Sequence, residues 1–138
     1  MNLKRSLMIS GVIAVVLVAG AGYYEYVVVP GEKAPPTAAE LQAWQYPVEQ
    51  ITTNLAGGST IQVQFTVQAP NAAINAELQD MSSQVDDAVI GVLHNLSSYT
   101  IMQHGGYTIL RDDVAKKINA LLPNGKIDTV YIDSLIVQ

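Results

Sequence analysis

The residues of this 138-residue chain that could do chemistry are few, and they are not grouped as a reactive site requires. There are no cysteines, which excludes disulfides, thiolate zinc sites and cysteine nucleophiles. The two histidines, His94 and His104, match no common zinc spacing, although Asp86 and Asp87 stand upstream as conceivable ligands. A solvated helix face explains these two carboxylates better. We therefore predict neither a metal site nor a cofactor.

Carboxylate pairs for acid–base catalysis would have to come from the aspartates, and each of these has a simpler role. Asp112 and Asp113 fall in the first turn of an expected helix, where the helix dipole favours anions. They also stand four residues before Lys116 and Lys117, the spacing of helical ion pairs. Asp133 interrupts an apolar strand, as charges on edge strands do. We expect no catalytic residue and no enzyme activity.

The charge balance is acidic, and it excludes some classes of partner. The formal net charge is -5, and from Gly31 onward eleven acidic residues oppose five basic ones. No basic stripe exists in that part, which argues against nucleic acid and against anionic lipid head groups as ligands of the domain itself.

A single apolar run near the start predicts a membrane anchor within residues 1–29. Residues 6–24 are all uncharged, and as a helix they would span roughly 28 Å, close to the hydrocarbon thickness of a bilayer. Lys4 and Arg5 precede the run, so the positive-inside rule leaves the N-terminus cytoplasmic and the rest outside. The alternative is a cleaved signal peptide with its cleavage site at Ala19-Gly20-Ala21. Both interpretations place the domain on the same side.

Residues 30–45 are predicted to be a linker that ends in a short helix. Pro35 and Pro36 favour an extended spacer. Thr37 and Glu40 have the spacing of a capping box, which predicts a helix through Leu41 and Trp44. Trp44 is the only tryptophan, and it has three possible neighbours: the domain, the membrane interface or a partner.

Residues 46–138 are predicted to form one α+β domain. The periodicity predicts strands over 46–55 and 60–69, joined as an antiparallel hairpin by the Gly57-Gly58 turn. In the second strand the odd-numbered positions are apolar and the even-numbered ones, through Gln68, are polar, so one face is buried and the other wet. Helices are expected over 74–81, along the apolar stripe from Val85 to Leu96, and over 108–122. A final strand covers 127–138. The expected fold is a β-hairpin, two or three helices and a C-terminal strand.

The end of the chain carries a pattern that resembles the C-terminal signature of the FliL family of flagellar proteins. The pattern is an Ile-Asn helix end, a glycine loop and a Val-Tyr strand that runs to a terminal Gln. The matching residues are Ile118, Asn119, Gly125, Val130, Tyr131 and Gln138. The Asn54-Leu55 pair before a glycine turn and the Gly105-Gly106 pair also agree. One departure is Ile132-Asp133-Ser134, where the family usually has Phe-Thr and an acidic residue, so a partner contact through that pair is in doubt.

The resemblance implies a stomatin-like (SPFH-like) domain outside the bacterial inner membrane, on a single-pass protein that is not an enzyme. It implies a flagellar motor accessory that forms rings around stator units, joins the basal body and supports torque, swimming or swarming. We expect the linker to face the stator, with Leu41 and Trp44 as contact residues. The alternative is a membrane-tethered or secreted small binding domain unrelated to flagella.

Overall fold

The computed structural model describes residues 34–138. The predicted anchor over 6–24 therefore lies outside the described residues, and within them no helix is long and apolar enough to cross a membrane. Residues 36–138 form one compact unit. Its helices are α2 (Ala38–Ala43), α3 (Ala72–Asp80), α4 (Ser82–Asn95), α5 (Ser98–Met102) and α6 (Gly106–Leu121). Its strands are β1 (Gln45–Pro47), β2 (Ile51–Asn54), β3 (Thr60–Gln68) and β4 (Thr129–Val137), so the predicted α+β class is confirmed.

Strand β3 is the centre of an antiparallel sheet and follows the predicted alternation. Its inward side chains, Ile61, Val63, Phe65 and Val67, are fully buried. Along its whole length β3 pairs with β4, from Ile61 opposite Val137 to Gln68 opposite Thr129. On its other edge it pairs with β2, and Asn54 lies opposite Thr60. Gly57 and Gly58 both have φ of 95° in the connecting turn, a conformation that favours glycine. The predicted hairpin is therefore confirmed.

The prediction of one strand over 46–55 is wrong, because the segment is broken in the middle. β1 pairs with β3 at Tyr46 opposite Val67, whereas β2 pairs at Ile51 opposite Val63, a register one residue out of step. β4 occupies the whole of the other edge, so β1 and β2 must share this one. Pro47 has no N–H to donate to a ladder, which explains why regular pairing stops there. Val48 N then donates to Phe65 O at 2.9 Å across the break.

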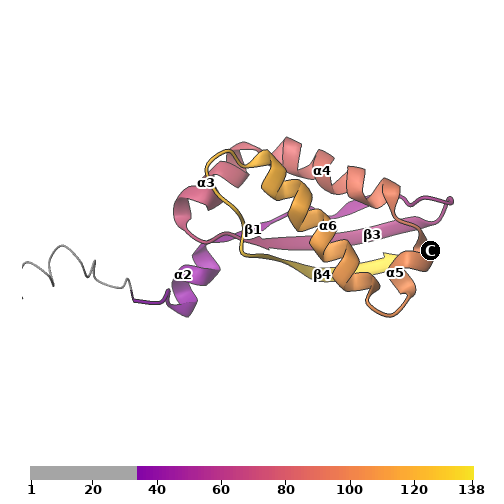
Figure 1. The fold of residues 1–138 in the computed structure, drawn as a ribbon, viewed down its shortest axis with the longest axis horizontal. Coiled ribbons are helices and arrows are strands. Elements are labelled where there is room, and N and C mark those ends of the chain that lie inside the picture. Colours follow the sequence, from indigo (N-terminus) through magenta and orange to yellow (C-terminus); the bar gives the residue numbers. More distant parts are fainter. Residues whose placement is uncertain (1–33) are drawn as a thin grey trace, which may run out of the picture. The chain divides into compact units, whose positions relative to one another are not determined.

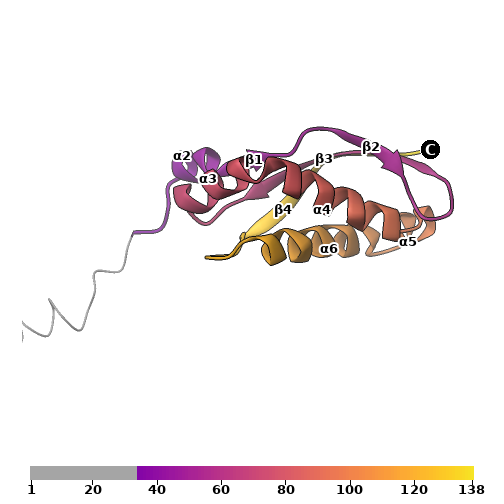
Figure 2. The ribbon, with the colours of Figure 1, turned by 90° about the horizontal axis from the view of Figure 1, so that it is seen from above.

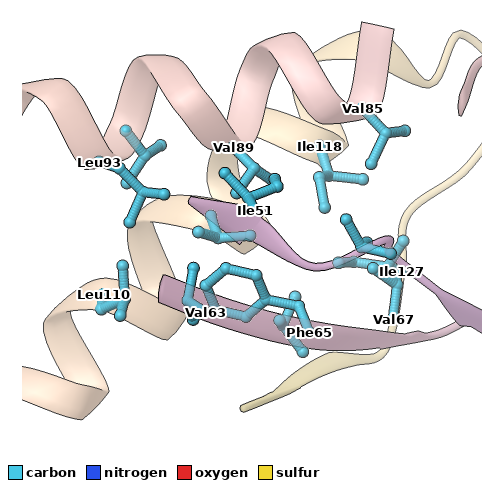
Figure 3. Packing of buried hydrophobic residues seen from close by; sticks show 14 of the residues in the cluster. Ile51, Val63, Phe65, Val67, Val85, Val89, Leu93, Leu110, Ile118 and Ile127 are labelled. Atoms are coloured by element: carbon cyan, nitrogen blue, oxygen red, sulfur yellow. The ribbon is translucent and has the colours of Figure 1, made fainter. Parts of the chain in front are cut away.

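Helices α4 and α6 cover the inward face of this sheet, α4 in contact with β2 and α6 with β4 (Figures 1 and 2). The apolar stripe of α4 is buried as predicted. Figure 3 shows Val89 and Ile118 above Phe65 in the core between the two layers. Protein interiors are close-packed, so the helices must fit against the apolar side chains of β3. These side chains therefore determine which face of the sheet the helices cover.

Four helices, rather than the expected two or three, separate β3 from β4. The added element is α5, a short helix whose N-cap, Ser97, accepts from Thr100 N at 3.1 Å. α6 begins at Gly106, earlier than the expected residue 108. A Cβ at Gly106 would collide with the carbonyl oxygens of Thr100 and Ile101, so glycine permits the close turn between α5 and α6.

Strand β4 contains a one-residue bulge at Asp133. Ser134 lies opposite Gln64 and Ile132 opposite Phe65, which leaves Asp133 without a Cα partner on β3. Its Oδ2 accepts from the Thr66 hydroxyl at 2.7 Å. Thr66 belongs to the outward set of β3, so the Asp133 carboxylate lies on the face of the sheet opposite the helices.

We predict that removal of residues 130–138 abolishes cooperative unfolding of a fragment that starts at residue 34. The deletion leaves one edge of β3 without its ladder and removes Val130, which is fully buried. A domain is stable by only roughly 5–15 kcal/mol, so the loss of nearly a whole strand removes a large part of that margin. Thermal unfolding followed by circular dichroism is the measurement. A sharp transition at an unchanged midpoint would contradict the prediction.

Candidate functional site

The candidate contact residues lie on α2, whose first turn is closed by the predicted capping box. Glu40 N donates to the Thr37 hydroxyl oxygen at 3.3 Å, and Thr37 N donates back to Glu40 Oε2 at 2.8 Å. The hydrogen bond from the Thr37 backbone holds the pKa of Glu40 below its usual value, and the Thr37 hydroxyl lowers this pKa further. The helix therefore starts at a fixed residue although none of its side chains is buried.

The other end of α2 is held by side chains of the domain. Gln68 Nε2 donates to Leu41 O at 3.0 Å, and Asn75 Nδ2 donates to Ala43 O at 3.1 Å. Ala69 N donates to Trp44 O at 3.0 Å. The last carbonyls of a helix lack regular partners within it. These donors give Ala43 O and Trp44 O a partner and add a second one to Leu41 O, which also accepts from Trp44 N at 3.3 Å. We call Gln68 and Asn75 the α2 clamp.

Sequence reasoning did not find this clamp. Gln68 was predicted to lie on the wet face of its strand, but it is only 4% exposed, because α2 covers that end of the face. Asn75 is 7% exposed, and in the described chain these two are the buried polar residues. Nothing in the alternation separates Gln68 from the other polar residues of the strand. Its position beside Ala69-Pro70, where the strand ends, was the available signal.

The two candidate contact residues differ in exposure. Leu41 is 36% exposed on α2. Trp44 is half-buried and packs against the core. Of its three possible neighbours, the domain therefore contacts part of the side chain. The clamp fixes the direction in which both side chains are presented.

The structure does not bring the candidate ligands together. His94 Nε2 lies 2.8 Å from the Thr53 hydroxyl oxygen, and His104 is exposed in the connection between α5 and α6. Across residues 34–138 no group of three His, Asp or Glu side chains is placed to hold a metal ion. The ion pairs expected at i,i+4 on α6 do not form either. In this part of the chain the one ion pair within 4.0 Å joins Arg111 to Asp112, at 3.9 Å.

One carboxylate is electrostatically unfavourable. Oδ1 of Asp86 is buried and has no hydrogen-bond partner among the residues that the structure describes. Burial raises the pKa of Asp86, and the charge of Glu49 raises it further. The pKa of Tyr46 is raised as well, by burial first and then by the charges of Asp86 and Glu49. An ionised Asp86 carboxylate in this environment therefore lowers the stability of the fold.

The family-pattern residues have structural contacts. Ile118 and Val130 are fully buried in the core. Asn119 Oδ1 accepts from Ile127 N at 2.8 Å and so joins the end of α6 to the segment that leads into β4. Gly125 lies against Ile74, where a Cβ would meet that side chain. The last two positions lie on or beside the sheet. Tyr131 is exposed on β4, and Gln138 exchanges two backbone hydrogen bonds of 2.8 Å with Thr60.

We predict that Asp86→Asn raises the melting temperature at pH 7 by about 2 °C, a typical size for a near-surface change. A raised folded-state pKa means that the ionised carboxylate opposes folding above that pKa, and that the opposition disappears once the group is protonated. The gain should therefore shrink as the pH falls through the raised pKa. Asp87→Asn, an exposed neighbour with the same change of charge, is the control. An equal gain in both variants would contradict the prediction.

We also predict that Gln68→Leu loosens α2. The substitution keeps a side chain of similar size but removes the donor to Leu41 O, at a cost of about 1–2 kcal/mol. Hydrogen exchange of the α2 amides should become faster relative to those of β3. Gln62→Leu, at an outward position of the same strand, is the matched control. Unchanged exchange in Gln68→Leu would show that the clamp does not hold the helix.

Comparison with known proteins now identifies the family. Residues 45–138, which contain all four strands and helices α3 to α6, match the family model "Flagellar basal body-associated protein FliL". The chain is 31% identical over 106 residues to the "Flagellar protein FliL" of Bacillus subtilis (strain 168), which covers 77% of this chain and 76% of that protein. It is 26% identical over 76 residues to the "Flagellar protein FliL" of Aquifex aeolicus (strain VF5), covering 55% of this chain and 47% of that protein. The resemblance in the sequence is confirmed, and the chain belongs to the FliL family of flagellar basal body-associated proteins.

Proposed function

We propose that this protein is an accessory of the flagellar motor that associates with stator units in the membrane and supports torque, swimming or swarming. The observation that carries the proposal is the family match, which spans the whole sheet and the helices that cover it. The family implies a flagellum-associated role, and the association with stators is the finer step that we add.

The proposed arrangement is a single-pass protein of the bacterial inner membrane. Residues 6–24 are its anchor, the N-terminus is cytoplasmic, and the domain is periplasmic or extracytoplasmic. The domain is stomatin-like in this proposal, and several copies associate into a ring with the stator inside. Tethering in one membrane raises the effective concentration of the copies, so weak contacts between them suffice.

We place the stator contact on α2. The linker lies between the anchor and the domain, and two features support its role as a contact. Leu41 is exposed at its surface, and the clamp fixes the helix to the domain, which avoids the entropy loss of ordering a free linker on binding. Trp44, half covered by the core, contributes the part of its side chain that remains accessible.

We predict that a single cysteine at Leu41 forms adducts with stator subunits in membranes. The chain has no native cysteine, so a cross-link is assigned without ambiguity. Ala39→Cys is the matched control, since two residues along a helix correspond to about 200° of rotation, and position 39 therefore faces the other way. Leu41→Ala with Trp44→Ala should reduce swarming while the amount of protein stays the same. Leu41→Ala alone separates the contact from any loss of packing at Trp44.

Three results decide between the proposals. Stator adducts at residue 41 but not at 39, together with reduced swarming, support the stator contact. Normal motility in a deletion strain would contradict the flagellar function and favour the small binding domain unrelated to flagella. Reduced motility with no adduct at either position would retain the flagellar role but reject α2 as the stator contact.

A further inference from the structure

Two broad faces of the domain have no partner within it, and they differ in charge and shape. One is the face of the sheet opposite α4 and α6, which we call the open sheet face. The other is the outer surface of the helix layer, where α4 and α6 lie side by side (Figure 2). α2, where the chain enters the domain, lies at one end of the long axis rather than on the middle of either face (Figure 1).

The open sheet face is nearly free of charge but carries exposed apolar side chains. Asp133 is the single charged residue in the four strands of the described chain. Around it the outward positions of β3 are Gln and Thr, whereas β4 presents Tyr131 and Ile136, which are 46% and 49% exposed. The 2.7 Å hydrogen bond from Thr66 holds the Asp133 carboxylate on this face. Tyrosine and few charges are typical of the core of a protein interface.

The helix layer contains a groove of the opposite sign. A depression of about 390 Å³ lies between α4 and α6. Val92, Leu96 and Ala120 form its apolar part, and Lys116 and Lys117 stand at its edge. Within residues 34–138 neither lysine has a carboxylate within 4.0 Å, and Asp113 is the acidic residue of the lining. The half of α4 that borders the groove, from Ala88 to Asn95, contains no Asp, Glu, Lys or Arg.

We propose that the open sheet face of one copy docks onto the α4–α6 groove of a second copy. Tyr131 and Ile136 would lie against the apolar lining, and the Asp133 carboxylate would lie beside Lys116 and Lys117. The inference rests on the proposed ring and names the surfaces that build it.

A second copy of this chain suits both surfaces in charge, symmetry and position. Residues 34–138 are acidic, so two copies repel except where carboxylates are few or face cations. The sheet face has Asp133 and the groove has Asp113 as its acidic residue, and in the proposed contact Asp133 faces two lysines. The surfaces are different, so the contact is head-to-tail and can repeat until a ring closes. The sheet face and the groove both lie on broad sides of the domain, whereas the chain enters the domain at its α2 end. Copies with their α2 ends pointing the same way can therefore lie side by side.

The test is cross-linking between two differently tagged full-length copies in membranes of a strain that lacks stator subunits. One copy carries Tyr131→Cys and the other Ala120→Cys, and a short bismaleimide joins them. We expect a mixed adduct well above that of the control pair, Tyr131→Cys with Ala76→Cys. Ala76 is exposed on α3, away from the groove, and offers the same alanine-to-cysteine change.

Charge reversal tests the electrostatic part. Lys116→Glu with Lys117→Glu should reduce the mixed adduct about tenfold, because attraction is replaced by repulsion at two positions. Adding Asp133→Lys to the tyrosine-side copy should restore most of it. Melting temperatures of the variants should stay close to that of the parent, which separates loss of contact from loss of fold.

Several outcomes would overturn the inference. They are a mixed adduct no greater than the control, an adduct between two Tyr131→Cys copies that exceeds the mixed one, or charge reversal without effect. Because the strain has no stators, absence of the mixed adduct does not bear on the predicted stator adduct at residue 41. The result that contradicts the proposed function is a different one, normal motility in a deletion strain.

Discussion

The alternation of apolar and polar side chains along β3 determines which face of the sheet receives the helices. Both edges of this strand are paired, and its four inward residues, Ile61, Val63, Phe65 and Val67, are fully buried. A slip of one residue in either neighbour would move its apolar set to the solvent face. A register shift of one residue nevertheless occurs in two places. Between β1 and β2 it follows Pro47, where regular pairing stops, and in β4 it occurs as a bulge at Asp133.

The elements with a strong period were predictable from the sequence. β3, the buried stripe of α4 and the final strand each carry enough apolar residues at one spacing to fix their type. The capping box predicted the start of α2, because its two side chains are local in sequence. The break between β1 and β2 was not predicted. Pro47 lies in this segment, but the residues around it have the composition of one continuous strand. Short α5 was too brief for any period to be seen.

The candidate site was predictable only in part. Leu41 and Trp44 were indicated by the sequence, but the hydrogen bonds from Gln68 and Asn75 to the carbonyls of α2 were not predicted. Such contacts join residues 27 and 32 positions apart in the chain, and no local pattern encodes them. The same holds for Asp133, whose bond to Thr66 spans 67 positions. The prediction of ion pairs on α6 was wrong for a different reason. A spacing of four residues permits an exposed ion pair, but such a pair is too weak to hold the two side chains together.

The way in which α2 joins the sheet also has a mechanical consequence. Trp44 leads directly into β1, so a pull on the linker is transmitted along that strand. The same pull acts at once on the backbone bond from Ala69 N to Trp44 O and on the side-chain bonds from Gln68 and Asn75. These three bonds join the end of α2 to the end of β3 and to α3, so a load on the linker reaches elements beyond β1. A tether built in this way distributes force over several elements of the domain.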